Sequence, residues 1–440
     1  MDNPTLIIRQ AQVLLPNGEL ELGDVALAGG KILQVGGMVA PSPGVGEIDA
    51  QGLTLLPGVI DPQVHFREPG LEHKEDLATA TRACARGGVT SFLEMPNTNP
   101  LTTTQAALTA KLALAASKCL VNYGFFIGAT AENLPDLNRA QPACGIKIFM
   151  GSAHGPLLVD TEAALEPIFA SGRRLIAVHA ENQARILERR QLFAGETNPR
   201  VHSQIQDNQA ALEATQLALK LSEKYQRRLH ILHLSTADEA ELLRQDKPAW
   251  VTTEVTPQHL LLTVEDYDRI GTLAQMNPPL RSRHDTEVLW QALLDGVIDC
   301  IATDHAPHTL AEKARGYPQT PSGMPGVETA LPLMLTQAAQ GRCTLAQVAQ
   351  WMAIAPARIY AIPNKGQIAP GYDADLVLVD LQTYRPVRRE DLQTKCGWSP
   401  FEGWSLTGWP VVTLVNGQVV YDHGQFNLAV RGRPLTFRAG

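Results

Sequence analysis

Several residues that can do chemistry directly follow apolar runs of the sequence. The stretch DPQVHFREPG comes after the apolar run LTLLPGVI. Because alternate residues of a strand point to the same side, Gln63, His65 and Arg67 are expected to share one face. A histidine there can bind a metal, and an arginine can grip a carboxylate through two parallel hydrogen bonds. The alternatives are a hydrogen-bonded core histidine and an arginine paired with Glu68 or Glu72.

A lysine lies inside another apolar run. Lys147 is flanked by Ile146 and Ile148 in CGIKIFMG. Burying an ammonium group is costly unless it is neutralised or paired, so one interpretation is a lysine that reaches the surface along its aliphatic stem. The other is a desolvated, nucleophilic amine, which carbon dioxide would convert into a carbamate able to bridge two cations. Its position among the other polar residues favours the second interpretation.

Histidines end two further apolar runs. His179 ends RLIAVHAE and His233 ends RLHILHLS, and each can present an imidazole nitrogen to a metal. His230 is expected to face another way and to be structural. Glu181 is either a partner that orients a histidine ring or a solvated acid at the start of a helix.

An aspartate completes the set of potential ligands. Asp304 lies in IDCIATDHAPH, and a carboxylate at the end of a buried strand can bind metal and carry a proton. The alternative is a helix N-cap. His308, four residues later, makes the motif more specific than any single residue. Asn97 in EMPNTNP and Asn277 in MNPPLR can supply amide hydrogen bonds, although asparagine is also a common turn residue.

The elements that must position these residues alternate between apolar strands and helical stretches. DNQAALEATQLALKLSEKYQ, for example, has the i, i+3, i+4 apolar spacing of an amphipathic helix. Eight strand-then-helix units with nearly continuous apolar strands favour an α/β fold with a parallel (β/α)8 barrel over an open doubly wound sheet. The carboxyl ends of barrel strands meet at one mouth, where the polar residues would converge. The expected strands are LTLLPGVIDPQVHF, VTSFLEMP, VNYGFFIGAT, GIKIFMG, RLIAVHAE, RLHILHLS, WVTTEVTP and IDCIATDHAPH.

The two ends of the chain have a different pattern, of short strands separated by glycine turns. Residues 1–53 and 363–440 are therefore expected to pair into one small β-sandwich beside a barrel of residues 54–362. The proline- and glycine-bearing stretch 313–326 follows the last barrel strand. It is predicted to be a long mobile loop over the mouth.

Composition restricts the class of function. The 440 residues carry a formal net charge of -8, with 44% hydrophobic and 19% charged residues, which argues for a globular protein and against a nucleic-acid or anionic membrane partner. The six cysteines form no CxxC pair and indicate free thiols in a reducing compartment. The N-terminus has no basic region before an apolar run, and no apolar run approaches the ~20 residues of a membrane span. We expect a cytoplasmic protein that acts on a small molecule.

Together these motifs resemble the amidohydrolase superfamily, and within it the long-chain (class I) dihydroorotases. The resemblance covers essentially the whole chain, and it implies a metal-bearing barrel with a small β-sandwich made from both termini. It also implies zinc-dependent interconversion of dihydroorotate and N-carbamoyl-aspartate in pyrimidine synthesis, and a homodimer. Its markers are GVIDPQVHFREPG, MPNTNP, GIKIFMG, VHAE, HILHLST, EVTPQHLLLT, MNPPLR, ATDHAPH, SGMPGVE and SPFEGW.

The resemblance implies a role for each candidate residue. Asp304 would be the general acid and base. Arg67 would favour a dihydroorotase over a dihydropyrimidinase, whose substrate rings lack a carboxylate. It would also favour a dihydroorotase over an allantoinase, which usually carries Asn at this position. One or two divalent cations would be held by His65, carboxylated Lys147, His179, His233 and Asp304. The substrate would be bound by Arg67, Asn97, Asn277, His308 and the backbone at Pro325 and Gly326.

Two positions depart from the family pattern. Gln63 replaces the first histidine of His-x-His, and Gln258 stands where the family usually has histidine in PHH. An amide oxygen is a poorer zinc ligand than imidazole, so one cation would be held less firmly. The outcome is a slower binuclear enzyme, an enzyme with one firmly held metal, or a non-catalytic partner of aspartate carbamoyltransferase. The retained Asp304 and Arg67 favour an active enzyme.

Overall fold

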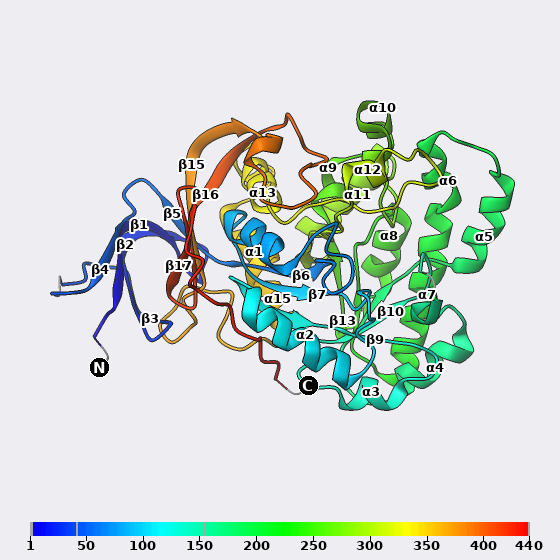
Figure 1. The fold of residues 1–440 in the computed structure, drawn as a ribbon, viewed down its shortest axis with the longest axis horizontal. Coiled ribbons are helices and arrows are strands. Elements are labelled where there is room, and N and C mark those ends of the chain that lie inside the picture. The colour runs from blue at the N-terminus through cyan, green and yellow to red at the C-terminus, as the bar shows by residue number, and fades with distance from the viewer. Residues whose placement is uncertain (1–2, 41–42, 154, 439–440) are drawn as a thin grey trace.

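The computed structural model describes residues 3–40, 43–153 and 155–438. Within them, parallel strands form a closed barrel at the centre of the molecule (Figure 1). β6, β7 and β8 pair in one sheet, and β9 through β14 pair in another. Only Phe126 separates β8 from β9, so they form one interrupted strand, and a bridge between Val64 and His305 joins the first strand to the segment that follows the last. The described chain thus has eight barrel strands where the sequence predicts them, the first of them only in its second half, from Val59. Their bounds are β6 (Val59–Val64), β7 (Val89–Glu94), β8 (Asn122–Phe125), β9 (Ile127–Gly128), β10 (Ile146–Phe149), β11 (Ile176–His179), β12 (Leu229–Ile231), β13 (Val251–Val255) and β14 (Cys300–Ile301).

Helices surround the barrel (Figure 1). The predicted amphipathic helix is α7: Asp207 caps its start by accepting from the backbone N–H of Ala210, and Gln226 ends it in the left-handed conformation with φ 50°. Its alanine-rich face is buried against the barrel, as the apolar spacing predicts. The helices are α1 (Leu77–Arg86), α2 (Gln105–Lys118), α3 (Leu134–Arg139), α4 (Glu162–Ala170), α5 (Gln183–Leu192), α6 (His202–Ile205), α7 (Asn208–Tyr225), α8 (Ala237–Asp246), α9 (Pro257–Leu261), α10 (Asp266–Ile270), α11 (Arg283–Leu294), α12 (Leu310–Lys313), α13 (Ala330–Ala339), α14 (Leu345–Ala349) and α15 (Ala355–Ile359).

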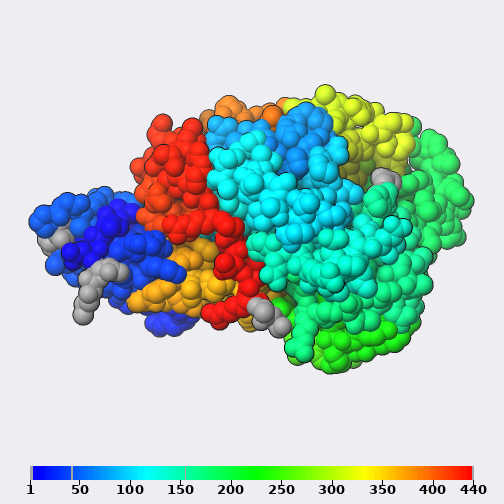
Figure 2. All heavy atoms as spheres, turned by 60° about the horizontal axis from the view of Figure 1, so that its bottom comes forward, coloured from blue at the N-terminus to red at the C-terminus, as the bar shows by residue number. Residues whose placement is uncertain are grey.

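The two ends of the chain meet in one mixed sheet beside the barrel. The N-terminal part of this sheet protrudes from the rest of the molecule in Figure 2. β5 joins the ends because it pairs with β1 in parallel and with β15 in antiparallel orientation. The predicted pairing of the termini is confirmed: strands from both ends of the chain follow one another in one continuous mixed sheet. The strands are β1 (Leu6–Leu14), β2 (Leu20–Ala28), β3 (Lys31–Val35), β4 (Gly46–Asp49), β5 (Thr54–Pro57), β15 (Leu376–Pro386), β16 (Ser405–Val415), β17 (Gln418–Asp422) and β18 (Gln425–Phe426).

The structure corrects the predicted boundaries of these parts. The apolar run expected to open the barrel at residue 54 is divided at Gly58, and its first half, β5, belongs to the terminal sheet. At the other end, residues 427–438 leave the sheet and return to the barrel. There the backbone N–H of Gly432 donates to the Cys119 carbonyl at 2.9 Å, and Pro434 forms a bridge with Tyr123.

The stretch predicted to be a mobile loop is fastened to the barrel. The buried ammonium of Lys313 donates to the carbonyl oxygens of Gln275, Pro321 and Gly323 at 3.0, 2.9 and 3.1 Å. Gly323 has φ +142°, and a Cβ there would lie 2.4 Å from the Ala306 carbonyl oxygen, so only glycine permits this approach. The stretch therefore forms a fixed wall of the barrel mouth.

Two expectations about the whole chain concern thiols and membranes. All six cysteines are buried, and no disulfide joins them in the described structure. No helix of the described residues combines the length and the apolar character needed to cross a bilayer.

Candidate functional site

A cavity of about 180 Å³ opens at the carboxyl ends of the barrel strands. It brings together nine of the eleven residues that the sequence singled out: His65, Arg67, Asn97, Lys147, His179, His233, Asn277, Asp304 and His308. Gln63, Phe149, Ser152, Ala306, Ser322 and Gly323 complete the described lining. Pro325 and Gly326 lie outside that lining, and the Gly326 N–H already donates to His305 Nδ1 at 3.0 Å.

Two histidines on neighbouring strands face each other in the cavity. His179 Nδ1 lies 2.9 Å from His233 Nε2. His179 Nε2 lies 2.7 Å from a Glu181 oxygen, and Glu181 also accepts from the Ser152 hydroxyl at 2.7 Å. Burial opposes ionisation of Glu181, yet the bond from His179 keeps the pKa of this carboxyl below its usual value. Glu181 therefore orients the His179 ring, which leaves its other nitrogen directed at the cavity.

Lys147 presents a buried amine to the cavity. Lys147 is fully buried, and its Nζ has no hydrogen-bond partner among the described residues. Strand alternation explains the orientation: Ile146 and Ile148 pack into the outer core, so Lys147 and Phe149 point inward. Burial lowers the pKa of Lys147 to about 7. A substantial neutral fraction near pH 7 is what a lysine needs in order to react with carbon dioxide.

Asp304 contacts both Gln63 and His65 of the opening motif. Its Oδ1 accepts from Gln63 Nε2 at 3.1 Å and lies 3.1 Å from His65 Nε2. The other nitrogen of His65 lies 2.7 Å from the Asn97 carboxamide oxygen, so this nitrogen carries the proton and donates. Burial lowers the pKa of His65, which keeps the ring neutral.

Arg67 places a guanidinium at the edge of the cavity. Neither Glu68 nor Glu72 pairs with it; its Nε donates to the Pro307 carbonyl at 3.1 Å, and one terminal nitrogen lies 3.2 Å from His308 Nε2. Burial lowers the pKa of Arg67 only to about 10, so it stays charged at neutral pH. Arg67 is 7% exposed and has no carboxylate partner within ion-pair distance among the described residues, so an anion can take that place.

His308 is fixed beside Arg67 by two further contacts. Lys74 Nζ lies 3.0 Å from its Nδ1, so Nδ1 accepts and Nε2 carries the proton towards the Ser322 carbonyl at 3.0 Å. Burial and the nearby charges of Arg67 and Lys74 hold the pKa of His308 well below its ordinary value. The ring is a neutral donor at the cavity wall.

Supporting residues that the sequence did not reveal include Ser152, Lys74 and His202. His202, in α6, places its Nε2 2.8 Å from the Asn277 carboxamide oxygen and so fixes the direction of that side chain. Its partner is 75 residues away along the chain, and no local pattern around His202 marks it. The amide nitrogens of Asn97 and Asn277 are both left to face the cavity.

Backbone strain is concentrated at this mouth. Arg67, Ser152, His233 and Asp304 have φ values of 70°, 54°, 37° and 47°, in a region that residues with a Cβ seldom adopt. Such conformations cost on the order of 1–3 kcal/mol each and persist where the surrounding packing enforces them. All four residues line the cavity, as is usual where a side chain must be held for chemistry rather than for stability.

The donor set fits a divalent cation. Three buried polar atoms of the cavity have no hydrogen-bond partner in the described chain: Lys147 Nζ, His233 Nδ1 and Gln63 Oε1. Buried polar atoms are rarely left unsatisfied, and nitrogen and oxygen donors of this kind are zinc ligands. The residues that would hold a cation are His65, Lys147, His179, His233 and Asp304.

A second group of potential ligands lies deeper in the barrel. The ligand atoms of His230, Glu254 and Cys300 lie within 4.8 Å of one another. His230 already uses both nitrogens, on the Thr252 hydroxyl at 2.8 Å and on Glu254 at 3.0 Å. These bonds agree with the structural role expected for His230, and a cation there would have to displace one of them.

Known proteins resemble this chain over most of its length. Residues 54–420 match the model of the amidohydrolase family. The chain belongs to the amidohydrolase family. Among its relatives in this family, the dihydroorotase of Methanosarcina mazei is 36% identical over 96% of both chains, and that of Halobacterium salinarum is 39% identical over 84% of this chain and 86% of its own. The solved structure of L-hydantoinase (dihydropyrimidinase) from Arthrobacter aurescens superimposes with a TM-score of 0.94 at 30% identity, covering 99% of this chain and all of its own.

Proposed function

We propose that this amidohydrolase is a dihydroorotase, which reversibly hydrolyses the cyclic amide of dihydroorotate to N-carbamoyl-aspartate in pyrimidine synthesis. The observation that carries the proposal is the buried Arg67 guanidinium, which faces the reaction cavity without a carboxylate of its own. A substrate carboxylate would supply the missing partner through paired hydrogen bonds. The names of the sequence relatives support the same assignment.

The cavity residues divide the work of binding. Arg67 and the free amide groups of Asn97 and Asn277 hold the carboxylate and neighbouring polar atoms of the ring. His308 lies at the same wall, where the Ser322 carbonyl and the substrate compete for the proton on its Nε2. The backbone at Pro325 and Gly326, implied by family resemblance, stays a prediction. Four fixed donors would orient the small ring so that its amide carbonyl faces Lys147 and the two histidines.

Asp304 carries the proton in this proposal. Its carboxylate accepts a proton from the attacking water, a new C–O bond forms at the amide carbonyl, and the ring C–N bond breaks as the proton passes to the leaving nitrogen. Ring closure follows the same path in reverse. A cation bound by His65, Lys147, His179, His233 and Asp304 would polarise the carbonyl and make water more acidic. Zinc, a second cation and carboxylation of Lys147 are parts of the proposal.

Gln63 bears on the rate rather than on the reaction. Its amide nitrogen donates to Asp304 and its oxygen is unpartnered, so the side chain both restrains the proton carrier and offers a weak oxygen ligand. We therefore propose a slower enzyme than one with a second imidazole at this position. The free, buried thiols suit the cytoplasm, where we place the reaction. A homodimer and an association with aspartate carbamoyltransferase stay predictions.

A second candidate is a hydantoin- or dihydropyrimidine-cleaving enzyme. The likeness to L-hydantoinase favours it. Such rings have no carboxylate, however, and would leave the Arg67 charge buried and unpaired, which is costly.

The test is turnover of dihydroorotate, dihydrouracil and hydantoin by the purified protein with zinc, manganese or cobalt added. Dihydroorotate alone, or strongly preferred, is the expected substrate. Preference for the uncharged rings would establish the second candidate. Absence of turnover with every ring and metal, in a folded protein, would contradict both candidate activities. It would leave the role of a non-catalytic partner of aspartate carbamoyltransferase.

A further inference from the structure

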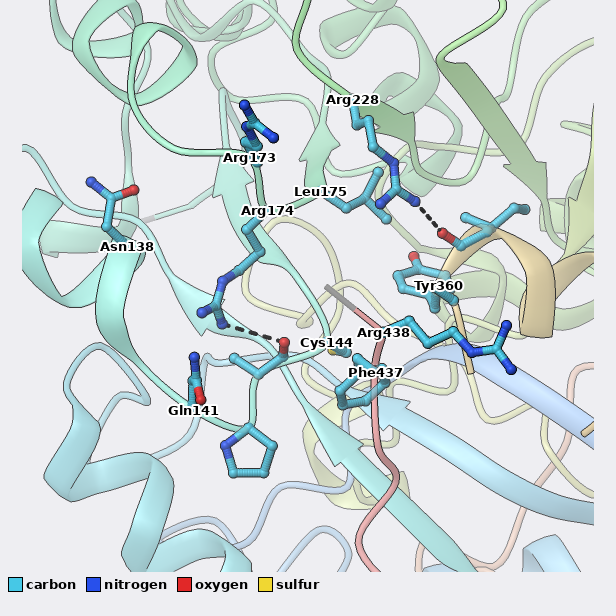
Figure 3. A pocket seen from close by; sticks show the side chains of 14 residues that line it. Asn138, Gln141, Cys144, Arg173, Arg174, Leu175, Arg228, Tyr360, Phe437 and Arg438 are labelled. Carbon is cyan, nitrogen blue, oxygen red and sulfur yellow. Dashed lines mark hydrogen bonds between the residues drawn. The ribbon is translucent and has the colours of Figure 1, made fainter. Parts of the chain in front are cut away.

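A second cavity, of about 380 Å³, lies at the opposite end of the barrel. Cys144, Leu175 and Arg228 line it, and each lies one or two residues before a barrel strand: β10, β11 and β12. The segment after α15 and the C-terminal residues Phe437 and Arg438 form another wall (Figure 3). The amidohydrolase reaction proposed above does not use this end of the barrel.

The cavity carries positive charge in a chain that is acidic as a whole. Arg173, Arg174, Arg228 and Arg438 line it, and no aspartate or glutamate does so in the described chain. None of the four guanidinium groups forms an ion pair with a described carboxylate. With a formal net charge of -8 for the whole chain, four arginines without acidic partners form a marked local excess of positive charge.

Two of these arginines are fixed by backbone carbonyl groups. Arg174 donates to the carbonyls of Ala143 and Ala140 at 3.3 and 2.5 Å, and Arg228 donates to that of Ile359 at 2.7 Å, as Figure 3 shows in part. A guanidinium has five N–H donors, so both keep free donors for an anion. Their geometry is set before any ligand binds, which reduces the entropy that binding would cost.

The other two arginines are exposed at the rim. The Arg173 and Arg438 side chains have no hydrogen-bond partner in the described structure and come from distant parts of the sequence. Both side chains are free to change rotamer and reach a ligand.

A neighbouring buried arginine adds to the potential. Arg227 is 2% exposed, and none of its side-chain nitrogens has a hydrogen-bond partner within the described residues. Burial is the main cause that lowers the pKa of Arg227, and repulsion from Arg174 is the second. The pKa falls only to about 10, so Arg227 keeps its charge at neutral pH. A buried charge without a partner is costly, and an anion in the adjacent cavity would offset part of this cost.

Aromatic groups line the same cavity. The rings of Tyr360 and Phe437 lie beside the arginines (Figure 3). Tyr360 contributes its ring to this wall, because its hydroxyl is buried away from solvent. An aromatic wall next to several guanidinium groups suits a ligand with both a planar ring and an anionic group.

An adjacent cavity shows that basic residues at this end are not all alike. Lys247 and Arg358 line it, and both approach Asp299, at 2.8 and 3.9 Å. Their charge is neutralised within the chain. The four-arginine cavity has no such acid.

We propose that the four-arginine cavity binds a small phosphate ester that carries a planar ring, of the chemical class of nucleotides. The guanidinium groups of Arg173, Arg174, Arg228 and Arg438 supply the positive charge that attracts the phosphate, and the ring packs against Phe437 and Tyr360.

The experiment is isothermal titration calorimetry of the full-length protein at low ionic strength. The probes are uridine and adenosine 5′-monophosphates, with inorganic phosphate and the two unphosphorylated nucleosides for comparison. We expect saturable binding of the monophosphates that weakens as salt is raised, weaker binding of phosphate, and none of the nucleosides. No saturable binding of either monophosphate would overturn the proposal. Equal affinity for phosphate and monophosphates would overturn the assignment of the ring.

Variants locate the site. Arg173→Gln with Arg438→Gln removes two exposed charges that have no described partner, so the fold is expected to persist; affinity should fall about tenfold or more. Arg433→Gln is the matched control in the same C-terminal segment and should leave affinity unchanged. Phe437→Ala should weaken the monophosphates but not phosphate. If Arg67→Met abolishes binding while the double variant retains it, the anion occupies the carboxyl-end cavity and the proposal is wrong.

Discussion

The two ends of the barrel use polar residues in different ways. At the carboxyl end, groups of both charge signs converge on one cavity, four of its residues have strained backbone, and three buried polar atoms are unsatisfied. At the amino end, four arginines line a cavity to which no described residue contributes a carboxylate or an imidazole, and two of them donate to backbone carbonyls. The first arrangement supplies a proton carrier and cation ligands. The second supplies mainly positive charge and aromatic surface, which suits binding rather than chemistry.

Among the changes that distinguish the two ends of the barrel, Asp304→Asn is expected to have the largest effect, which is on turnover. Asparagine keeps the shape but cannot carry the proton, so turnover of dihydroorotate should fall by roughly 10²–10⁴-fold. Steady-state kinetics measures it, with circular dichroism to verify folding. Asp268→Asn, at an exposed carboxylate, is the control and should leave turnover unchanged. Retained activity in Asp304→Asn would remove the proton carrier from the account.

A smaller loss is expected from Glu181→Gln. Glu181 accepts from His179, so the amide would loosen the orientation of that ring and reduce cation affinity by about 10–100-fold. Metal content after dialysis against graded chelator concentrations measures it. Glu188→Gln, on the exposed face of the neighbouring α5, should retain the metal content of the unmodified protein. The same metal content in both variants would contradict the orienting role.

Gln63→His is expected to raise, rather than lower, the affinity of the carboxyl-end cavity for a cation. An imidazole would replace the amide whose oxygen has no partner, and cation affinity should rise by about tenfold. The same dialysis experiment measures this gain. A fall in affinity would mean that the bond from Gln63 to Asp304 matters more than the missing ligand.

The smallest effects are expected at the amino end, and they concern stability. Arg174→Met removes two hydrogen bonds to carbonyl groups and should lower the free energy of unfolding by about 1–3 kcal/mol. Arg173→Gln breaks no described bond and should change it by less than about 0.5 kcal/mol. Urea unfolding compares the two. Equal losses would show that Arg173 has a structural role and is not held free for a ligand.

Strand order and the mouth residues were predictable because parallel barrel strands are buried on both faces. Such strands appear in the sequence as apolar runs, and a polar residue at the end of a run, such as His179 or Asp304, stands out. Strand alternation then places Lys147 inside the barrel. These signals are local, and so they can be read from one sequence.

The parts that were missed depend on contacts between distant segments. β5 was assigned to the barrel because its apolar run continues through Gly58 without a change in pattern. His202 supports Asn277 across 75 residues. The four arginines of the second cavity come from three separate segments: Arg173 and Arg174, Arg228, and Arg438 near the C-terminal end. A single sequence contains no signal for such pairings.

The most direct test of the central claim compares two substrates in two proteins. The ratio of kcat/KM for dihydroorotate to that for dihydrouracil is measured in the unmodified protein and in Arg67→Met. We predict that the ratio falls by about 100-fold in the variant, through loss of dihydroorotate turnover, because the carboxylate loses its buried guanidinium partner. An unchanged ratio would contradict the assignment of Arg67 and, with it, the proposed substrate.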